Sequence, residues 1–479
     1  MAQTATIRTR IHIEETNQFP RAATLYGLKE LARRAGVSAE MFRSWRIAFE
    51  DSGSITVFVQ PGTNRRIHFP HADPWFWGDT FAGKFHTSTA KWMCEPEQPL
   101  ALLRDFKIPF STDERNQLGP LFASSGLDCI VCPVDLPTST MLTLARFEET
   151  LESSHDEHGR FSAYSSIAWR DGFLHRPIVD EYGIAFAQAL MHLLPGWTPT
   201  EKRLRVKLGH DVDHIGIPFS LRSTLGHTLR RNRPLATLRD FLAPAIGIET
   251  SYEKLLRIIA GLSRERGLDS AVYWKASAPG PHDSGYDLHH KRIKALIADF
   301  RELGVELGIH PGYQTYESEE TLRIEVSALR HLLGERRLGG RQDFLRWNPR
   351  MWVLWDSLGL AYDASVGFAD HIGFRTGTSI PYRPWLISER READLLEIPI
   401  LGMDTTLQGY MQLKPEQALS KLQDCVARCR LVGGVFSLVW HNTTLMDRGY
   451  ALVYRKLLDE LAGTEGYDWR SAGDGTFWN

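Results

Sequence analysis

The most regular pattern of apolar and polar positions opens the segment 204–214, L-R-V-K-L-G-H-D-V-D-H. From Leu204 to Leu208 every second residue is apolar, and the residues between them are basic. This period of two is typical of a β-strand with one buried face. We expect the strand to end at Gly209, so that the polar cluster that follows lies at a strand end.

Short apolar runs and amphipathic segments alternate through the rest of the C-terminal part. We predict strands at Ala271–Ala276, Val305–Ile309, Ala361–Val366, Leu395–Leu401 and Val435–Trp440. We predict helices at Ser251–Arg266, Leu288–Leu303, Ser318–Leu333 and Pro415–Cys429, with Ser318 as an N-cap. Strands that alternate with helices indicate an α/β fold with a mostly parallel sheet or barrel.

Residues 1–195 follow a different pattern. We predict strands at Thr6–Glu14 and Ser54–Gln60, and helices at Met141–Glu152 and Asp180–Leu194. The sequence P-G-W-T-P at 195–199 is typical of a hinge between two folded units. We therefore expect an N-terminal accessory domain of mixed α+β structure at 1–195 and a second domain at 196–479.

Side chains that suit a metal follow the first strand. Asp211 and Asp213 are two positions apart, and on an extended chain such side chains point to the same side. Two carboxylates this close repel each other unless a cation or a shared proton lies between them. A turn in which an aspartate caps a helix is the alternative. His210 and His214 favour the metal site, because divalent Zn, Fe and Mn bind His and Asp ligands.

Two other predicted strands end in a histidine. V-E-L-G-I-H ends at His310, and F-S-L-V-W-H ends at His441. Between them, R-Q-D-F-L-R-W brings Arg341 and Asp343. Because β/α barrels carry their functional residues at the carboxyl ends of successive strands, we expect these side chains to meet those of the first strand.

Composition and charge limit the class of protein. Of the 479 residues, 43% are hydrophobic and 24% are charged, which is typical of a globular protein and not of a disordered one. The formal net charge of −2 gives no indication of nucleic-acid binding. Without a signal-peptide pattern or an apolar stretch long enough for a membrane span, we expect a cytoplasmic protein with no transmembrane segment. The five cysteines are sparse and are expected to be reduced thiols.

Several motifs together resemble a known family. H-D-V-D-H, G-I-H-P-G-Y, R-Q-D-F-L-R-W, Y-D-A-S-V-G-F-A-D-H-I-G-F-R-T-G-T and L-V-W-H-N occur in this order between Leu204 and Leu461. They resemble motifs of polysaccharide deacetylase-like proteins of the NodB-homology superfamily, carbohydrate esterase family 4. The resemblance implies a distorted (β/α)7 barrel with a metal at the C-terminal ends of its strands. Residues 100–190 resemble an uncharacterised N-terminal domain that is often joined to such barrels.

The resemblance also implies roles for individual residues. Asp211 would be the catalytic base, oriented by Arg341. His441 would be the general acid that protonates the leaving amine. Asp213 and His310 would bind the metal. The chemistry agrees with these roles, because a carboxylate beside a dication is a better base than acid and a histidine is an effective acid near neutral pH.

The third metal ligand is where this chain departs from the family. The family usually places it four residues after the first histidine ligand, which here is Gln314, a poor ligand. Relatives with the R-Q-x-x-L-R-W motif commonly carry His at its third position, where this chain has Asp343. We expect Asp213, His310 and Asp343 to bind a divalent ion, Zn, Mn or Co. His214 as the third ligand, or a degraded site, are the alternatives.

The function implied is hydrolysis of a C–N bond other than a peptide bond. The leading prediction is a metal-dependent deacetylase that acts on an N-acetylated saccharide or a glycan precursor. One alternative keeps the fold and takes a cyclic imide or ureide as substrate. Another is a glycan-binding or assembly protein without catalytic activity on a deacetylase scaffold. The metal content of the purified protein would separate this last alternative from the enzymes.

Overall fold

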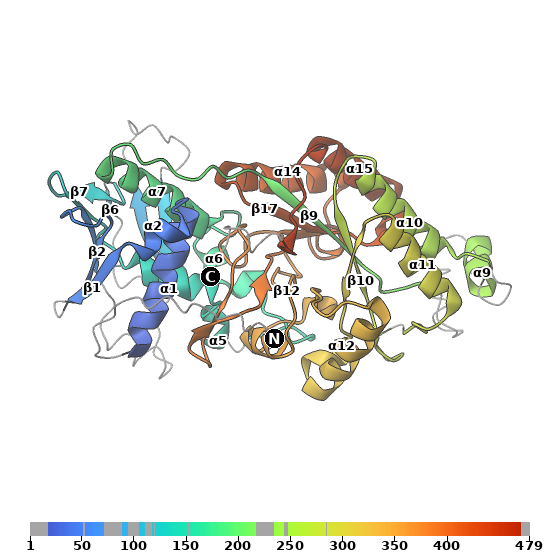
Figure 1. Ribbon diagram of the computed structural model, residues 1–479. Coiled ribbons are helices and arrows are strands. Elements are labelled where there is room, and N and C mark those ends of the chain that lie inside the picture. Colours follow the sequence, from blue (N-terminus) through green and yellow to red (C-terminus); the bar gives the residue numbers. More distant parts are fainter. Residues whose placement is uncertain are drawn as a thin grey trace.

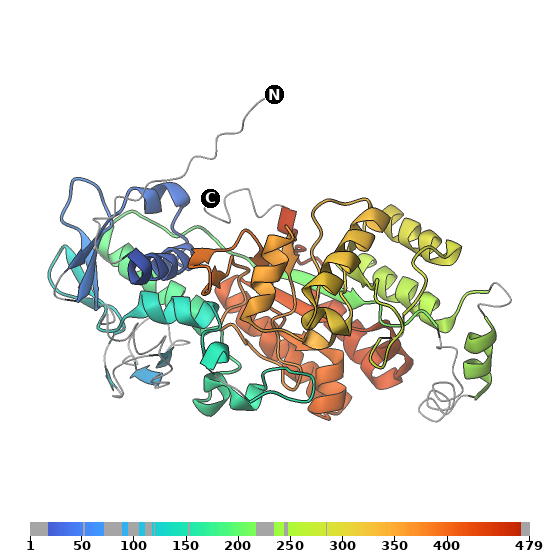
Figure 2. The same cartoon turned by 90° about the horizontal axis from the view of Figure 1, so that it is seen from below.

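A computed structural model describes residues 18–50, 53–70, 89–93, 105–110, 117–118, 120–151, 154–216, 234–243, 248–283 and 285–470. The molecule is elongated, with the N-terminal elements at one end and a parallel sheet and its helices in the remainder (Figures 1 and 2). The strand predicted at Thr6–Glu14 lies outside the described residues. Within the described residues, no helix is long and apolar enough to cross a membrane.

The N-terminal part combines two small sheets with helices. Its strands are β1 (Arg46–Glu50), β2 (Ser54–Phe58), β3 (Arg66–Pro70), β4 (Thr89–Met93), β5 (Asp105–Pro109), β6 (Gln117–Leu118), β7 (Ala123–Ser124) and β8 (Cys129–Val131). One sheet has the order β1-β2-β3-β8-β7 and the other β5-β4-β6. The helices are α1 (Gln18–Arg34), α2 (Ala39–Arg43), α4 (Leu136–Leu144), α5 (Glu148–Leu151), α6 (Ile167–Arg170) and α7 (Ile178–Leu193). Helix α1 packs against α4 and α7.

The C-terminal part is built on a parallel sheet, as the alternation of strands and helices predicts. Its strands are β9 (Arg205–Asp211), β10 (Ser270–Trp274), β11 (Glu306–Ile309), β12 (Tyr362–Asp363), β15 (Leu396–Glu397), β16 (Gly402–Met403) and β17 (Val435–Val439). The order β11-β10-β9-β17-β16 is parallel throughout. Gly340 forms parallel bridges to Ile309 and to Asp363, and so connects this sheet to the parallel pair β12-β15.

Helices flank the parallel sheet (Figure 1). They are α10 (Ser251–Arg264), α11 (Lys291–Glu302), α12 (Glu319–Leu333), α13 (Pro349–Ser357), α14 (Pro415–Val432) and α15 (Arg448–Leu461), with α9 (Pro234–Leu242) at the far end. The predicted N-cap of α12 is confirmed, because the Ser318 hydroxyl accepts a hydrogen bond from Thr321 N. A short antiparallel hairpin, β13 (Trp385–Leu386) and β14 (Arg391–Glu392), lies apart from the parallel sheet.

The two parts of the chain share one hydrophobic core. A single cluster of buried residues contains Leu28 and Phe186 from the N-terminal part and Trp274 and Trp352 from the C-terminal part. Charged groups are buried between the parts as well, since Arg375 Nη2 lies 2.5 Å from Glu149 Oε2 and both side chains are 1% exposed. The N-terminal part is therefore fixed firmly against the parallel sheet.

Several local predictions differ from the structure. The strands expected at Ala361–Val366 and Leu395–Leu401 are only Tyr362–Asp363 and Leu396–Glu397. The helix expected at Met141–Glu152 is two helices, α4 and α5, because Arg146 adopts a left-handed backbone with φ of 52°. The Arg146 guanidinium donates to Glu149 Oε1 at 2.8 Å, which holds this break in place. Strand β9 does not end at Gly209 but continues to Asp211. Helix α1 was not anticipated from the sequence pattern.

Candidate metal centre and active site

Strand β9 positions the first two acidic residues. Asp211 is its last residue, and Asp213 follows two positions later. A Cβ at position 209 would lie 2.6 Å from Arg341 Nη2 and 2.9 Å from the Tyr273 ring, so glycine lets both side chains keep these positions. The arginine side chain therefore crosses the strand at a point where the strand has no side chain of its own.

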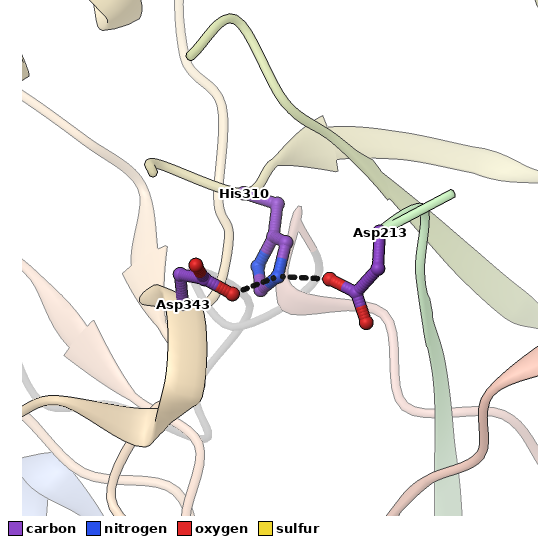
Figure 3. A group of neighbouring side chains, drawn as sticks. All are labelled: Asp213, His310 and Asp343. Carbon is purple, nitrogen blue, oxygen red and sulfur yellow. Dashed lines mark hydrogen bonds and ion pairs between the residues drawn. The ribbon is translucent and has the colours of Figure 1, made fainter. Parts of the chain in front are cut away.

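Asp213, His310 and Asp343 form a compact group of potential metal ligands (Figure 3). One ligand atom of each lies within 4.8 Å of the others, and no second group of this kind exists among the described residues. His310 Nε2 is 3.2 Å from Asp213 Oδ1 and 3.2 Å from Asp343 Oδ1. The histidine follows β11, and Asp343 begins a short 3-10 turn. Residues far apart in the sequence thus converge at the strand ends.

The orientation of His310 is that of a metal ligand. Its Nδ1 lies 2.7 Å from the carbonyl oxygen of Arg341, which can only accept, so Nδ1 carries the proton and donates. The other ring nitrogen, Nε2, then faces the two carboxylates. Metal-binding histidines are commonly fixed by such a bond from the second nitrogen to a backbone carbonyl.

The separations also suit a divalent ion. Two ligand atoms that bind one ion at about 2.1 Å with an angle of about 90–109° lie about 3.0–3.4 Å apart. The separations of 3.2 Å from His310 Nε2 fall within this range. Burial would lower the pKa of His310, but the Asp211, Asp213 and Asp343 carboxylates raise it to about 10. The group therefore stabilises positive charge at this position, as a site for a dication must.

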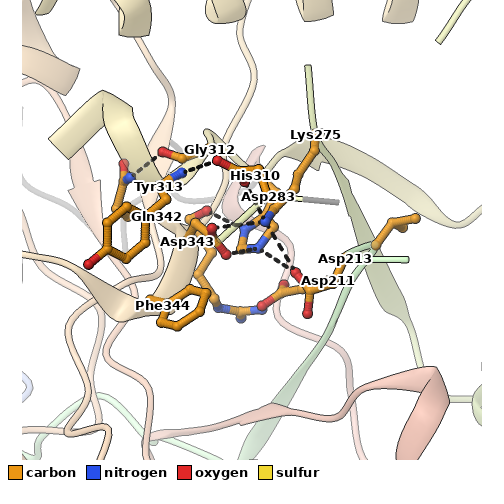
Figure 4. A network of polar contacts seen from close by, with 12 residues as sticks. Asp211, Asp213, Lys275, Asp283, His310, Gly312, Tyr313, Gln342, Asp343 and Phe344 are labelled. Atoms are coloured by element: carbon orange, nitrogen blue, oxygen red, sulfur yellow. Dashed lines mark hydrogen bonds and ion pairs between the residues drawn. The ribbon is translucent and has the colours of Figure 1, made fainter. Parts of the chain in front are cut away.

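Lys275 adds a buried cation that the sequence analysis did not identify (Figure 4). Its Nζ lies 2.8 Å from Asp343 Oδ2, 3.0 Å from Asp283 Oδ1 and 3.6 Å from Asp213 Oδ1. Burial opposes the charge on Lys275, but the three carboxylates raise its pKa, so it is an ammonium. The contact uses the oxygen of Asp343 that does not face His310. Lys275 and Asp343 together are formally neutral.

Asp211 is paired with Arg341. The guanidinium Nη1 donates to Asp211 Oδ1 at 2.6 Å, and its Nε donates to the carbonyl oxygen of Ala364 at 3.0 Å. Burial would raise the pKa of Asp211, but Arg341, His310 and His441 hold it below its usual value. Asp211 is therefore a carboxylate in a fixed orientation, which is what a proton acceptor requires.

His441 is held by Asp404, a residue that the sequence analysis missed. Asp404 Oδ1 accepts from His441 Nδ1 at 2.7 Å, and Asp404 Oδ2 accepts from the backbone N–H of His441 at 2.8 Å. His441 Nε2 then lies 3.4 Å from Asp213 Oδ2 and 3.9 Å from Asp211 Oδ2. Burial would lower the pKa of His441, but Asp404, Asp213 and Asp211 raise it to about 9. This histidine can deliver a proton at neutral pH.

One cavity of about 220 Å³ joins these side chains. Asp211, Asp213, His310, Asp343 and His441 line it, and Arg341 lies behind Asp211. Its other lining residues are Arg160, Gln342, Phe344, Leu345, Met403, Thr405 and Tyr410. The structure thus brings together the six side chains that were expected to form the site, and Arg160 extends its wall into the N-terminal part.

Other candidate residues lie outside the ligand group. Gln314 is exposed on a short 3-10 turn, and His214 does not belong to the group that contains His310. His210 is fully buried, its Nδ1 donates to Trp440 O at 2.8 Å, and burial lowers its pKa to about 4. It is a neutral packing residue. The described cysteines are buried thiols, namely Cys129, Cys132, Cys425 and Cys429.

Comparison with known proteins gives limited similarity. Residues 31–195 match the model of a family of unknown function, DUF7033. A comparison with curated proteins found no match.

Several solved structures resemble the chain. A protein assigned as a polysaccharide deacetylase from Mycobacterium smegmatis is 19% identical with a TM-score of 0.38, covering 57% of this chain and 90% of its own. Puue allantoinase is 14% identical with a TM-score of 0.41, covering 59% of this chain and 94% of its own. A protein assigned as a polysaccharide deacetylase from Pseudomonas aeruginosa PAO1 is 14% identical with a TM-score of 0.40, covering 59% of this chain and 97% of its own. These values are low, and the function proposed below stands on the side-chain geometry.

Proposed function

We propose that this chain is a metal-dependent hydrolase that removes an N-acetyl group from an amino sugar or a glycan precursor. In this proposal residues 196–479 form a distorted (β/α)7 barrel, and residues 1–195 form an accessory domain that packs against it. The observation that carries the proposal is the convergence of Asp213, His310 and Asp343, with Asp211 and His441 beside them in one cavity.

Asp213, His310 and Asp343 are the proposed metal ligands. When bound, a divalent ion supplies a Lewis acid that polarises the amide carbonyl and makes water more acidic. The Arg341 carbonyl keeps His310 in the tautomer that offers Nε2. The Lys275 ammonium keeps one oxygen of Asp343 occupied, so that the other is offered to the ion.

Asp211 is the proposed base. It accepts a proton from the water whose oxygen attacks the carbonyl carbon of the acetamido group. The pairing with Arg341 keeps Asp211 ionised and fixes the direction of its carboxylate. The bond between that carbon and the nitrogen then breaks, and the acetyl group leaves as acetate.

His441 is the proposed general acid. It donates the proton on Nε2 to the nitrogen of the leaving amine, while Asp211 keeps the proton taken from the water. The acetic acid formed ionises to acetate, and loss of the Asp211 proton to solvent with reprotonation of His441 restores both groups. Asp404 holds the ring by Nδ1 and stabilises the imidazolium before transfer. The acid nitrogen, His441 Nε2, lies 3.9 Å from the base oxygen Asp211 Oδ2, close enough for both to act on one acetamido group.

The experiment that tests this function combines metal analysis with acetate release. Purified protein loaded with Zn, Mn or Co should release acetate from at least one of a panel of N-acetylated mono- and oligosaccharides. Asp213→Ala should lose both bound metal and activity, whereas Asp394→Asn, at a side chain that is 98% exposed, should retain both. Stoichiometric metal with turnover of ureides but not of N-acetyl sugars would favour the allantoinase-like alternative. Wild-type protein without stoichiometric metal would contradict any metal-dependent hydrolase.

A further inference from the structure

Arg160 brings the N-terminal part into the wall of the proposed active site. Its Nη1 donates to the carbonyl oxygen of Phe344 at 3.1 Å, and its Nη2 donates to the hydroxyl of Tyr410 at 2.8 Å. Phe344 directly follows the proposed ligand Asp343. Tyr410 ends the π-helical turn Thr406–Tyr410, close in sequence to Asp404, which holds the proposed acid. One guanidinium thus joins the two segments that carry the two halves of the site.

The turn that carries Arg160 is rigid. Asp156 Oδ1 accepts from the backbone N–H groups of His158 and Arg160, each at 2.9 Å. Asp156 Oδ2 accepts from Arg160 Nε at 2.7 Å, which fixes the direction of the guanidinium. The residue is only 5% exposed but still lines the cavity.

Contacts with the C-terminal part hold the same turn in place. Arg346 Nε donates to His158 O at 2.7 Å, and the Tyr316 hydroxyl donates to Gly159 O at 3.2 Å. His158 Nδ1 and the Tyr313 hydroxyl are 3.0 Å apart. The position of Arg160 is therefore set before any ligand binds, which lowers the entropic cost of using it.

The guanidinium retains a donor for a ligand. A guanidinium has five N–H groups. Within the described residues, Nη1 makes only its contact with Phe344 O, so one of its two N–H groups stays available. Arg160 makes no ion pair with Asp213 or Asp343 in that part of the chain. Its ion pair is with Asp156, whose Oδ2 lies 2.7 Å from Nη2 and whose side chain is 34% exposed, so the carboxylate that pairs with it lies outside the proposed ligand group.

Two aromatic side chains flank this donor. Phe344 is 37% exposed and Tyr410 is 47% exposed, although both line the cavity. Phe344 has a left-handed backbone with φ of 57°, and Leu345 follows with φ of 53°. Strained backbone of this kind, at about 1–3 kcal/mol for each residue, is concentrated at ligand sites. Exposed rings beside a fixed cation form a surface that suits a sugar ring bearing an anionic group.

We propose that Arg160 binds an anionic group of the substrate, a carboxylate or a phosphate, and so makes the N-terminal part a determinant of specificity. The other charged lining groups are the carboxylates of Asp211, Asp213 and Asp343 and two histidines that contact them, so Arg160 is the lining cation that does not contact the proposed ligands. An anionic sugar is therefore oriented with its charged substituent at Arg160 and its acetamido group toward Asp213 and His310. This inference rests on the proposed function for the identity of the acetamido group, but the binding of the anion does not depend on it.

The test is binding of sugars that cannot be deacetylated. Calorimetry with the whole protein, metal-loaded and after chelation, would compare glucose, glucose 6-phosphate and glucuronate. We expect at least one anionic sugar to bind about tenfold or more tightly than glucose in both forms, which excludes direct binding to the metal as the cause. Preference for the phosphate or for the carboxylate then identifies the kind of anion.

Substitutions assign that preference to a residue. Arg160→Gln should abolish the preference for the anionic sugar while affinity for glucose changes less than about threefold. Arg160→Lys should keep part of it, because the charge remains but the fixed N–H on Nη1 is lost. Arg170→Gln, which removes an arginine that pairs with the neighbouring Asp171 in the same part of the chain, should leave it intact.

Several outcomes would overturn the inference. Equal affinity for glucose and both anionic sugars in the wild type would do so. If Arg160→Gln weakened the binding of all three sugars equally, Arg160 would only hold the segments of Phe344 and Tyr410 together. If Arg170→Gln lost the preference for the anionic sugar, the preference would be a general effect of positive charge. If Arg160→Gln does not fold, Arg160→Lys decides, since an unchanged preference would refute recognition by the fixed N–H on Nη1. Anion preference without acetate release from any substrate would refute the deacetylase and leave the anion site standing.

Discussion

The pair Asp404–His441 gives the sharpest test of the proposed chemistry. Asp404→Asn keeps the size of the side chain and removes its charge. His441 has a pKa raised from 6.5 to about 9, and Asp404 is the largest of the contributions that raise it. That difference corresponds to about 3 kcal/mol in favour of the charged ring. Asp404 contacts the ring directly at 2.7 Å and is separate from the proposed metal ligands, so its contribution remains when a metal is bound.

The sign of the effect follows from the role of His441. A general acid must carry its proton, so activity falls as the pH rises through the pKa of His441. Without the Asp404 charge this pKa decreases toward its ordinary value, because Asp404 is the largest of the groups that raise it. The basic limb of the pH–rate profile should therefore move to lower pH. Turnover at neutral pH should fall about 10²–10⁴-fold, because the ring also loses its fixed tautomer.

The assay is acetate release between pH 5 and 10, with metal content measured on the same samples. Asp394→Asn is the matched control, since it makes the same chemical change on the surface. His441→Ala should abolish the basic limb altogether. An Asp404→Asn variant with normal metal content and an unmoved basic limb would refute the assignment of His441 as the acid. Loss of metal in Asp404→Asn would instead indicate that His441 is a metal ligand.

Three further outcomes are expected. Asp211→Asn should lower turnover at least about 10²-fold and keep the metal, because only the proton acceptor is lost; near-wild-type turnover would remove Asp211 from the base role. Asp343→Ala should lose metal on dialysis, and Asp343→His should retain it; tight metal binding by Asp343→Ala would show that it is not a ligand. Glu149→Ala should reduce the free energy of unfolding in urea by about 3–5 kcal/mol, because it leaves Arg375 buried without its partner. The exposed pair of Glu319 and Arg323 is the control, and Glu319→Ala should cost at most about 1 kcal/mol.

The candidate ligands could be predicted because each follows an apolar strand or a recognisable motif. His310 is the first residue after β11, and His441 is the second residue after β17. A histidine directly after an apolar strand is itself the signal that identifies a candidate site residue. Lys275 and Asp404 occupy equivalent places, just after β10 and β16, and the same criterion could have found them. A single Lys or Asp at a strand end is common and carries no signal of its own, so only the three-dimensional arrangement shows which groups these two side chains contact.

Other features depend on contacts that the local sequence does not encode. Arg160 lies in the last quarter of the N-terminal part, and nothing in H-D-E-H-G-R-F indicates that its guanidinium reaches Phe344 and Tyr410. The break in the predicted helix Met141–Glu152 arises at Arg146, whose left-handed backbone is held by a buried network with Glu149. The expected boundary at 195/196 remains a prediction, whereas the core shared by the two parts became visible only in the structure.

Arg341 serves the proposed base and the proposed metal through different parts of one residue. Its side chain bonds to Asp211, and its main-chain carbonyl bonds to His310. Every amino acid offers that carbonyl, so substitutions at 341 act on the base alone and leave the ligand in its tautomer. A one-residue insertion or deletion beside it would displace both groups at once. The side chain at position 341 can therefore change and alter the basicity of Asp211. The length of the loop cannot change, because the bond to Asp211 and the bond to His310 must both be kept.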